Sequence, residues 1–324
     1  MTGSDNLFVH VEENGVSGVG EMAPGSTEGA DTPKKGEKML ADFCASEKSS
    51  NSIQENYDNA IEAGVAPCVV AALDMALWDL RAKQASLPLY KLLGLSKKVV
   101  PTSVTVGINP PEVVRERIPL LLDGTGVKAL KIKLGSPEGL DADQEMFSAV
   151  IEMTKNRSTI IRVDANGGWS VPDAKKMMQW LADRGVEYIE QPLKKGQEDD
   201  LIHLFKNRSL PIYVDESCRV SSDIPNFADR VDGVNLKLMK CGGITEALRI
   251  VSTARAFGLK TMIGCMGESS VSIAAGASIG SLFDYIDLDS HLNLDPDPCN
   301  GAEMTDGRIL PSDNLGHGGS ITNA

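Results

Sequence analysis

The sequence predicts an α/β protein, a modified TIM barrel of the (β/α)7β type with a small α+β capping domain formed by both chain ends. Three observations lead to this fold class. From about residue 99, eight short runs of β-branched and other apolar residues recur at intervals of roughly 25 residues. Helix signals lie between these runs. Five consecutive runs end in charged residues, at the barrel edge where active sites lie.

Residues 1–95 predict the N-terminal part of the cap. Apolar and polar residues alternate from Leu7 to Glu21 around Asn14-Gly15, a pattern typical of a β-hairpin. The polar sequence of residues 24–38 predicts a loop. Helix-compatible sequence then extends from about Glu37 to Lys83.

Residues 96–295 contain the predicted barrel. Its eight strands are expected in the runs VTVGI, ALKIKL, IIRVDA, VEYIEQ, PIYVDE, GVNLKL, KTMIGC and DYIDLD. Residues 296–324 are expected to return to the cap. There the turn and strand in TDGRIL, residues 305–310, are expected to pair with the N-terminal hairpin.

Composition restricts the partners. The net charge of −13 argues against nucleic acid, and no basic tract suggests an anionic membrane surface. No apolar run reaches the roughly 18 residues of a membrane span, and no secretory leader pattern opens the sequence. The six cysteines show neither zinc spacing nor a CxxC pair. We therefore expect a cytoplasmic protein whose partner is a small-molecule substrate, with assembly into a homo-oligomer also open.

Charged residues at the predicted strand ends mark a candidate metal site. Lys131 and Lys133 lie on the second strand and Lys237 ends the sixth. Three carboxylates end the strands between them: Asp164, Glu190 and Asp215. Carboxylates that converge on one axis repel each other unless a cation lies between them. Oxygen ligands without Cys or His select Mg²⁺ or Mn²⁺ over zinc.

The two lysine strands fall on opposite sides of an eight-stranded barrel. A substrate carboxylate at the metal would therefore present one face of its α-carbon to Lys133 and the other to Lys237. Removing the α-proton creates an enediolate, whose charge a divalent cation stabilises. Positive charge from Lys131 and the metal beside Lys133 favours the neutral lysine that a base requires.

Five motifs in this order resemble the enolase superfamily, and in particular its muconate lactonizing enzyme subgroup. They are KIK (131–133), DANGGW (164–169), EQP (190–192), DES (215–217) and LKLMKCGG (236–243). GCMGES stands where the mandelate racemase subgroup has a histidine. The resemblance implies that Asp164, Glu190 and Asp215 bind magnesium, that Lys133 and Lys237 are the acid/base pair, and that Lys131 contacts the substrate carboxylate.

A narrower resemblance lies at the eighth strand. Asp287 and Asp289 are similar to the DxD motif of dipeptide epimerases, which holds the substrate's α-ammonium group. Cys265 and Gly267 share one face of the preceding strand end, and the small Gly267 leaves room for a ligand. Thr105, at the end of the first strand, matches a substrate-contacting position. A plain packing role for Cys265 and a turn at Asp287-Asp289 are the alternatives.

These inferences predict an isomerase, a Mg²⁺-dependent epimerase of dipeptides of the L-Ala-D/L-Glu type that works by two-lysine 1,1-proton transfer. One alternative is a cycloisomerase or an o-succinylbenzoate synthase-like dehydratase. Relatives usually carry another strand and a mobile loop before the equivalent of Leu7, near which this sequence begins. The cap is therefore expected to lack them, so an inactive, truncated member is the other alternative.

Overall fold

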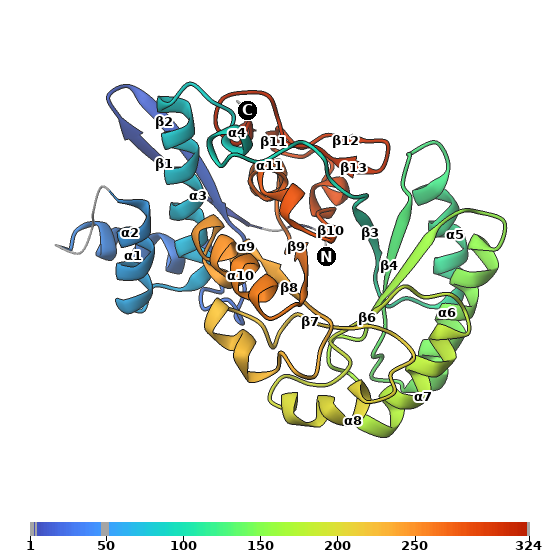
Figure 1. The fold of residues 1–324 in the computed structure, drawn as a ribbon. Coiled ribbons are helices and arrows are strands. Elements are labelled where there is room, and N and C mark those ends of the chain that lie inside the picture. The colour runs from blue at the N-terminus through green and yellow to red at the C-terminus, as the bar shows by residue number, and fades with distance from the viewer. Residues whose placement is uncertain (1–2, 4, 47–51, 323–324) are drawn as a thin grey trace.

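A parallel eight-stranded sheet, curled into a barrel, forms the centre of the molecule (Figure 1). The computed structural model describes residues 3, 5–46 and 52–322. Each predicted run contains one strand: β3 (Ser103–Val106), β4 (Ala129–Lys133), β5 (Ile160–Asp164), β6 (Ile189–Glu190), β7 (Ile212–Val214), β8 (Gly233–Lys237), β9 (Lys260–Gly264) and β10 (Tyr285–Asp287). The predicted fold class, a TIM-type barrel with a separate cap, is confirmed.

The barrel closes between its first and last strands. Thr102, just before β3, forms a parallel bridge with Ile286 of β10. The Thr102 hydroxyl also accepts a hydrogen bond from the backbone N–H of Leu288, at 2.9 Å. Because the ring is joined here, the ends of β10 and β3 lie side by side on the same wall.

Helices cover the outside of the barrel (Figure 1). They are α5 (Pro111–Leu122), α6 (Leu140–Thr154), α7 (Val171–Ala182), α8 (Ile202–Phe205), α9 (Leu238–Cys241), α10 (Ile244–Ala256) and α11 (Ser270–Ser278). Shorter 3-10 turns lie among them: η1 (Glu198–Leu201), η2 (Ser221–Asn226), η3 (Gly280–Leu282) and η4 (Ser290–Asn293). Between β7 and β8 the connection contains η2 and no α-helix among the described residues, so the outer layer is thinner there.

The cap begins with the predicted hairpin, β1 (Leu7–Glu13) and β2 (Val16–Met22). Asn14 and Gly15 connect the strands with φ of 54° and 77°, the left-handed pair that a two-residue turn requires. At Gly18 and Gly20, an added Cβ would lie 2.1 Å and 2.0 Å from backbone oxygens of the helix packed on the hairpin. Glycine therefore permits that close approach.

The helix-compatible sequence from about Glu37 to Lys83 forms several helices. The cap helices are α1 (Pro33–Cys44), α2 (Ile53–Glu62), α3 (Pro67–Gln84) and the short α4 (Leu89–Leu92). Gly64, at φ 76°, follows the end of α2 in the left-handed conformation typical of helix C-termini. Pro67 is the first residue of α3, where its missing N–H costs no intrahelical hydrogen bond. Thirteen of the 18 residues of α3 are buried, so it is the core helix between hairpin and barrel.

The expected pairing of TDGRIL with the N-terminal hairpin is also wrong. Asp306 and Gly307, at φ 50° and 70°, turn the chain back on itself, so β13 (Arg308–Ile309) pairs with β12 (Met304–Thr305). A second small ladder joins β11 (Cys299–Asn300) to β14 (Ser320–Ile321).

In the C-terminal segment, His317 contacts both α3 and β2 of the cap. The backbone N–H of His317 donates to Asp79 of α3 at 2.9 Å, and its ring Nε2 lies 2.8 Å from the carbonyl oxygen of Val19. Across residues 5–46 and 52–322, no helix combines the length and the apolar composition that crossing a bilayer requires.

Candidate active site

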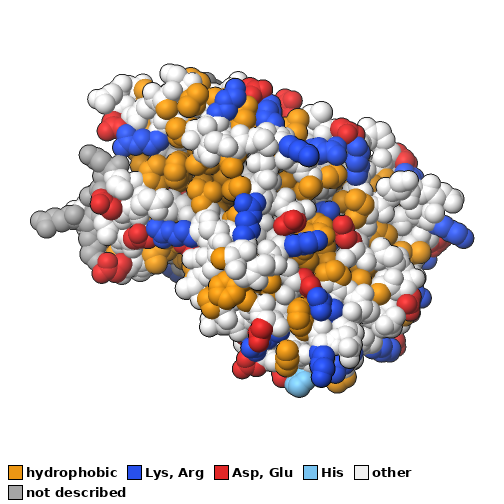
Figure 2. Space-filling model, in the orientation of Figure 1, with side chains coloured by type: hydrophobic (Ala, Val, Ile, Leu, Met, Phe, Trp, Pro, Cys, Tyr) orange, Lys and Arg blue, Asp and Glu red, His pale blue; other side chains and the backbone are white. Residues whose placement is uncertain are grey.

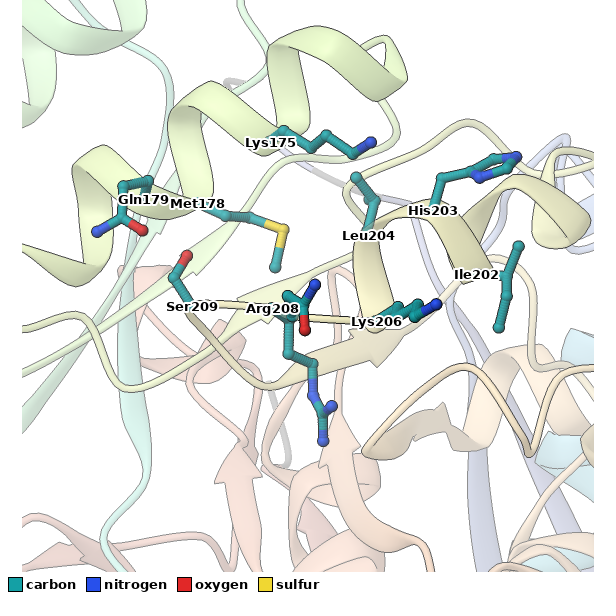
Figure 3. A pocket seen from close by; sticks show the side chains of 10 residues that line it. Lys175, Met178, Gln179, Ile202, His203, Leu204, Lys206, Arg208 and Ser209 are labelled. Carbon is teal, nitrogen blue, oxygen red and sulfur yellow. The ribbon is translucent and has the colours of Figure 1, made fainter.

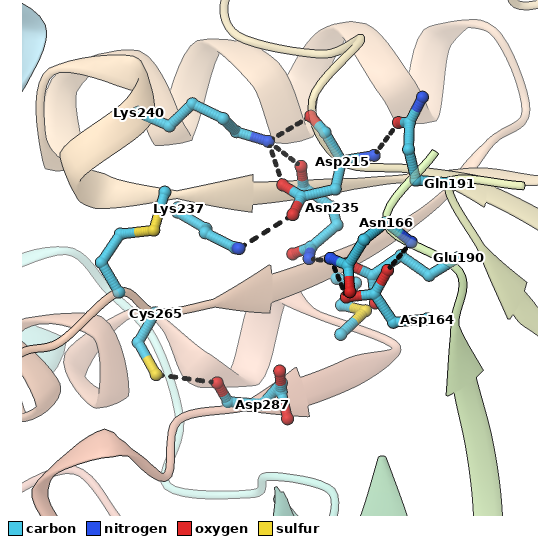
Figure 4. Close-up of polar contacts among 12 residues, drawn as sticks. Asp164, Asn166, Glu190, Gln191, Asp215, Asn235, Lys237, Lys240, Cys265 and Asp287 are labelled. Carbon is cyan, nitrogen blue, oxygen red and sulfur yellow. Dashed lines mark hydrogen bonds and ion pairs between the residues drawn. The ribbon is translucent and has the colours of Figure 1, made fainter. Parts of the chain in front are cut away.

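The candidate residues project from the C-terminal ends of neighbouring strands (Figure 4). In the parallel ladder, Lys133 pairs with Asp164 and Lys237 pairs with Gly264, so these positions lie at one level of the barrel. The residues predicted to bind metal, move protons or contact substrate all belong to this edge: Thr105, Lys131, Lys133, Asp164, Glu190, Asp215, Lys237, Cys265, Gly267, Asp287 and Asp289.

Lys133 and Lys237 approach different carboxylates. Lys133 Nζ lies 3.6 Å from Asp164 Oδ2, and its side chain is 34% exposed. Lys237 Nζ lies 2.8 Å from Asp215 Oδ2 on the other side, and its side chain is 9% exposed. Strands β5, β6 and β7 lie between the two lysine strands in the sheet. The three carboxylates thus stand between two amines that come from separate walls.

Asp215 is held by two lysines. Lys240 lies 2.5 Å from Asp215 Oδ1 and also donates to the Asn235 carbonyl oxygen at 2.9 Å, while Lys237 takes Oδ2. Burial alone would raise the pKa of Asp215, but the two ammonium groups hold it well below its usual range. Burial likewise opposes the charge of Lys237, yet Asp215 raises the pKa of that amine above its ordinary value.

Glu190 shows why these carboxylates suit a cation. It is fully buried, and its Oε2 has no hydrogen-bond partner among the described residues. Its Oε1 accepts a hydrogen bond from Asn235 Nδ2 at 2.6 Å. Burial raises the pKa of Glu190 to about 8 although Lys131 opposes the shift. Lys131 Nζ lies 3.6 Å from this Oε2. A buried carboxylate oxygen without a hydrogen bond costs free energy that a metal ion can recover.

The donor set therefore fits a hard divalent ion. Within the described chain, no three acidic, histidine or cysteine side chains stand grouped as a ready-formed metal centre. Both oxygens of Asp215 are paired with lysines, Oδ2 with Lys237 and Oδ1 with Lys240. Asp164, Glu190 and Asp215 supply only oxygen atoms, which is the ligand chemistry of Mg²⁺.

Polar neighbours orient these carboxylates. Asn166, at φ 47°, donates its backbone N–H to Asp164 Oδ1 at 2.9 Å and its side-chain amide to Oδ2 at 3.1 Å. Gln191, at φ 39°, accepts the backbone N–H of Asp215 at 2.9 Å. Left-handed backbone is uncommon outside glycine, and two such residues beside one site mark a constrained geometry.

The two aspartates at the end of β10 contact different protein groups. Asp287 Oδ2 forms an ion pair with Lys131, and Asp287 Oδ1 is buried without a partner among the described residues. Asp289 Oδ2 accepts the backbone N–H of Thr105 at 2.6 Å. Burial and the neighbouring Asp287 raise the pKa of Asp289 to about 6. The structure thus brings Thr105 to this pair through its backbone.

Cys265 and Gly267 border the same aspartates. The Cys265 thiol lies 3.3 Å from the Asp287 carbonyl oxygen (Figure 4). It also lies 3.6 Å from Asp289 Oδ1. Burial raises the pKa of this thiol, which disfavours the thiolate. The Gly267 carbonyl oxygen accepts a hydrogen bond from Asn6 of the cap at 2.8 Å. Cap and barrel therefore meet at this edge of the site.

Two residues near Lys237 received no role from the sequence. An added Cβ at Gly264 would lie 3.2 Å from both the Lys237 Cε and the Asn235 amide, so glycine gives the lysine its space. Glu268 is buried, and burial raises the pKa of its carboxyl to about 8. Its position after the seventh strand was visible in the sequence, but its burial was not.

Outside the barrel, a groove of about 440 Å³ lies between α7 and α8 (Figure 3). Its charged lining is basic, with Lys175, His203, Lys206 and Arg208, over an apolar floor that includes Met178. Arg208 is paired bidentately with Asp232. No candidate catalytic residue lines this groove, which is therefore separate from the candidate active site.

The face of the molecule drawn in Figure 2 has charged side chains near its middle. Lysine or arginine and acidic side chains lie close to one another near its middle, over the barrel, with hydrophobic side chains around them. A mixed-charge centre within an apolar surround is the composition expected of a small-molecule site.

Comparison with known proteins places this arrangement in a family. Residues 2–94 match the mandelate racemase/muconate lactonizing enzyme N-terminal domain, and residues 114–324 match the enolase C-terminal domain-like family. The chain therefore belongs to the mandelate racemase/muconate lactonizing enzyme family of the enolase superfamily, as the sequence predicted.

Its relatives in that family include enzymes named as dipeptide epimerases. A hydrophobic dipeptide epimerase from Roseobacter litoralis is 68% identical over 322 residues, which cover 99% of this chain and 93% of the relative. An L-Ala-D/L-Glu epimerase from Bacteroides thetaiotaomicron is 38% identical over 251 residues, 76% of this chain and 63% of the relative. The dipeptide epimerase structure from Enterococcus faecalis, complexed with Mg and L-Leu-L-Tyr, has a TM-score of 0.88 at 32% identity and covers 98% and 92% of the two chains.

Proposed function

We propose that the chain is a Mg²⁺-dependent epimerase of dipeptides, and that hydrophobic dipeptides are its substrates. The observation that carries this proposal is the placement of Lys133 and Lys237 on separate walls, each against a carboxylate of one acidic trio. Such an arrangement suits a reaction in which one lysine removes the α-proton and the other returns a proton to the opposite face.

Asp164, Glu190 and Asp215 would hold the cation, and Mn²⁺ offers the same coordination chemistry. When bound, the ion supplies positive charge against the negative charge that develops on the substrate carboxylate. Lys133 and Lys237 hold and move the proton at the α-carbon of the C-terminal residue. Asp287 and Asp289 provide carboxylate oxygens for an ammonium group at the other end of the substrate.

The class of side chain rests on the relatives. The name of the Roseobacter litoralis protein, at 68% identity, points to hydrophobic dipeptides. The L-Ala-D/L-Glu type named at 38% identity is the acidic counterpart that a substrate panel must include. Cycloisomerase and dehydratase substrates of the superfamily carry no α-ammonium group, so the aspartate pair at β10 favours the dipeptide.

The test is a dipeptide panel incubated with protein and Mg²⁺ in D₂O and read by mass shift and chiral chromatography. L-Leu-L-Tyr, L-Ala-L-Glu and an N-acylated amino acid represent the three substrate classes. Deuterium uptake with inversion in the hydrophobic dipeptide, but not in the N-acylated compound, is expected. No uptake in any dipeptide at saturating Mg²⁺ would overturn the proposal in favour of a non-catalytic member.

A further inference from the structure

Lys131 makes a contact that differs from those of the other two lysines. Its side chain is 3% exposed, and its Nζ pairs with carboxylates from three strands. Asp164 lies at 4.0 Å and Glu190 at 3.6 Å, and Asp287 of β10 is the shortest of the three pairs. Lys133 and Lys237 instead pair with Asp164 and Asp215.

The pair between Lys131 and Asp287 spans the barrel's closing seam. β3 lies between β4 and β10 in the ring, so the lysine reaches past one strand to meet the aspartate. Both side chains are almost fully buried, at 3% and 4% exposure. Because Oδ2 of the buried Asp287 is paired with Lys131, the lysine fixes the orientation of that carboxylate.

This contact leaves a specific atom for a ligand. With Oδ2 turned to Lys131, the Asp287 Oδ1 is buried and has no partner in the described chain. Asp289 has no ion pair with Lys131 among the described residues; its oxygens accept hydrogen bonds from the Thr105 N–H and the Cys265 thiol instead. The two aspartates are thus positioned by different parts of the protein.

We infer that Lys131 is a positioning residue for the substrate's ammonium group, acting through Asp287, in addition to any contact with the substrate carboxylate. This inference rests on the proposed function. Because Lys131 also lies beside Asp164 and Glu190, one amine joins the carboxylate end of the site to its ammonium end. That link sets the distance between the two ends and suits a substrate as short as a dipeptide.

The experiment compares two ligands that differ only in the ammonium group, L-Leu-L-Tyr and its des-amino analogue 4-methylpentanoyl-L-tyrosine. Their dissociation constants are measured by titration calorimetry with Mg²⁺ present, for the wild type and for Lys131→Met, which keeps the stem and removes the charge. The preference for the ammonium-bearing ligand is expected to fall about tenfold or more in the variant. Equal weakening of both ligands would overturn the inference, since a contact with the carboxylate alone predicts that result.

Double variants add a matched control. Lys131→Met and Asp287→Asn should show coupled losses in KM, with the double variant within about threefold of the worse single variant. The KM increases caused by Lys131→Met and Asp289→Asn should instead multiply in their double variant, because no ion pair joins these two residues. Multiplying losses in the Asp287 pair would also overturn the inference. Where Lys131→Met fails to fold by circular dichroism, Lys131→Gln takes its place.

The proposed function can fail separately. If the wild type exchanges no α-proton in D₂O yet still prefers the ammonium-bearing ligand, and Lys131→Met removes that preference, then the catalytic proposal falls and the positioning role stands. If exchange is normal and the preference survives in the variant, the positioning role alone falls.

Discussion

Lys237 Nζ lies 2.8 Å from Asp215 Oδ2, and the other oxygen of the same carboxylate, Oδ1, forms an ion pair with Lys240. One carboxylate thus connects a predicted acid/base lysine to Lys240, whose amine also donates to the carbonyl oxygens of Asp215 and Asn235. Proton transfer requires Lys237 to pass through its neutral form, whereas Asp215 stabilises its charged form. Engagement of Asp215 by a cation would weaken that stabilisation and free the lysine to titrate.

The two predicted acid/base lysines should be separable by stereochemistry. Lys133→Met and Lys237→Met are each expected to lower epimerisation at least a hundredfold, within the range for loss of a general base. Each variant should still exchange the α-proton of one stereoisomer in D₂O, because the remaining lysine can remove and return a proton on its own face. NMR of the separate L,L and L,D dipeptides measures this. Equal residual exchange of both isomers in either variant contradicts the two-base arrangement.

Lys240 is expected to contribute chiefly to stability. Its amine is buried and contacts Asp215 and the Asn235 carbonyl oxygen, so Lys240→Met leaves these groups short of a donor. Breaking a buried pair costs about 3–5 kcal/mol of unfolding free energy. Urea unfolding measures the loss, with Lys206→Met on the exposed outer groove as the control. A change below about 1 kcal/mol would match a surface pair instead.

Asp74 should make stability fall as pH rises. This α3 carboxylate is buried against Thr245 of α10, and burial raises its pKa from 3.8 to about 7, although the Thr245 hydrogen bonds oppose the shift. The folded protein therefore holds this proton more tightly than the unfolded chain. The stabilisation is complete below the unfolded pKa and is lost as pH rises through about 7.

Asp74→Asn removes the contribution of this carboxyl group to the pH dependence of the unfolding free energy. Unfolding free energies of wild type and variant are measured from about pH 4 to pH 8. The wild type should lose stability relative to the variant as pH rises, at up to about 1.4 kcal/mol per pH unit. Other buried acids such as Glu268 affect both proteins equally, so the difference between the two curves isolates Asp74. Parallel curves would show that Asp74 is ionised in the folded protein throughout.

The positions of many site residues could be predicted because charged residues recur along the sequence at the ends of the predicted strands. Asp164, Glu190 and Asp215 each follow a short apolar run, and the alternation of strands and helices places such residues at one barrel edge. The contact between Lys131 and Asp287 was not predictable, since 155 intervening residues and the closing seam separate them. The predicted pairing of TDGRIL with the N-terminal hairpin was wrong for another reason. A two-residue strand is too short for its sequence pattern to identify its partner strand.

Gly264 offers the most local test of how the barrel positions Lys237. Its added Cβ would lie 3.2 Å from the Lys237 Cε, closer than ordinary packing, so Gly264→Ala should displace the lysine by tenths of an ångström. Displacement of a reacting group by about 1 Å costs on the order of a hundredfold, so we expect kcat to fall roughly tenfold with KM little changed.

Gly276→Ala is the matched control for that variant. Its Cβ would lie 3.3 Å from the Leu288 side chain, a similar crowding among apolar atoms rather than against the lysine. The free energy of unfolding of each variant should be lower than that of the wild type by about 1–3 kcal/mol, the usual cost of mild overpacking. If Gly276→Ala lowers kcat as much as Gly264→Ala does, the loss reflects general strain in the barrel. If only Gly264→Ala lowers it, the empty space at Gly264 is what allows Lys237 to reach its working position.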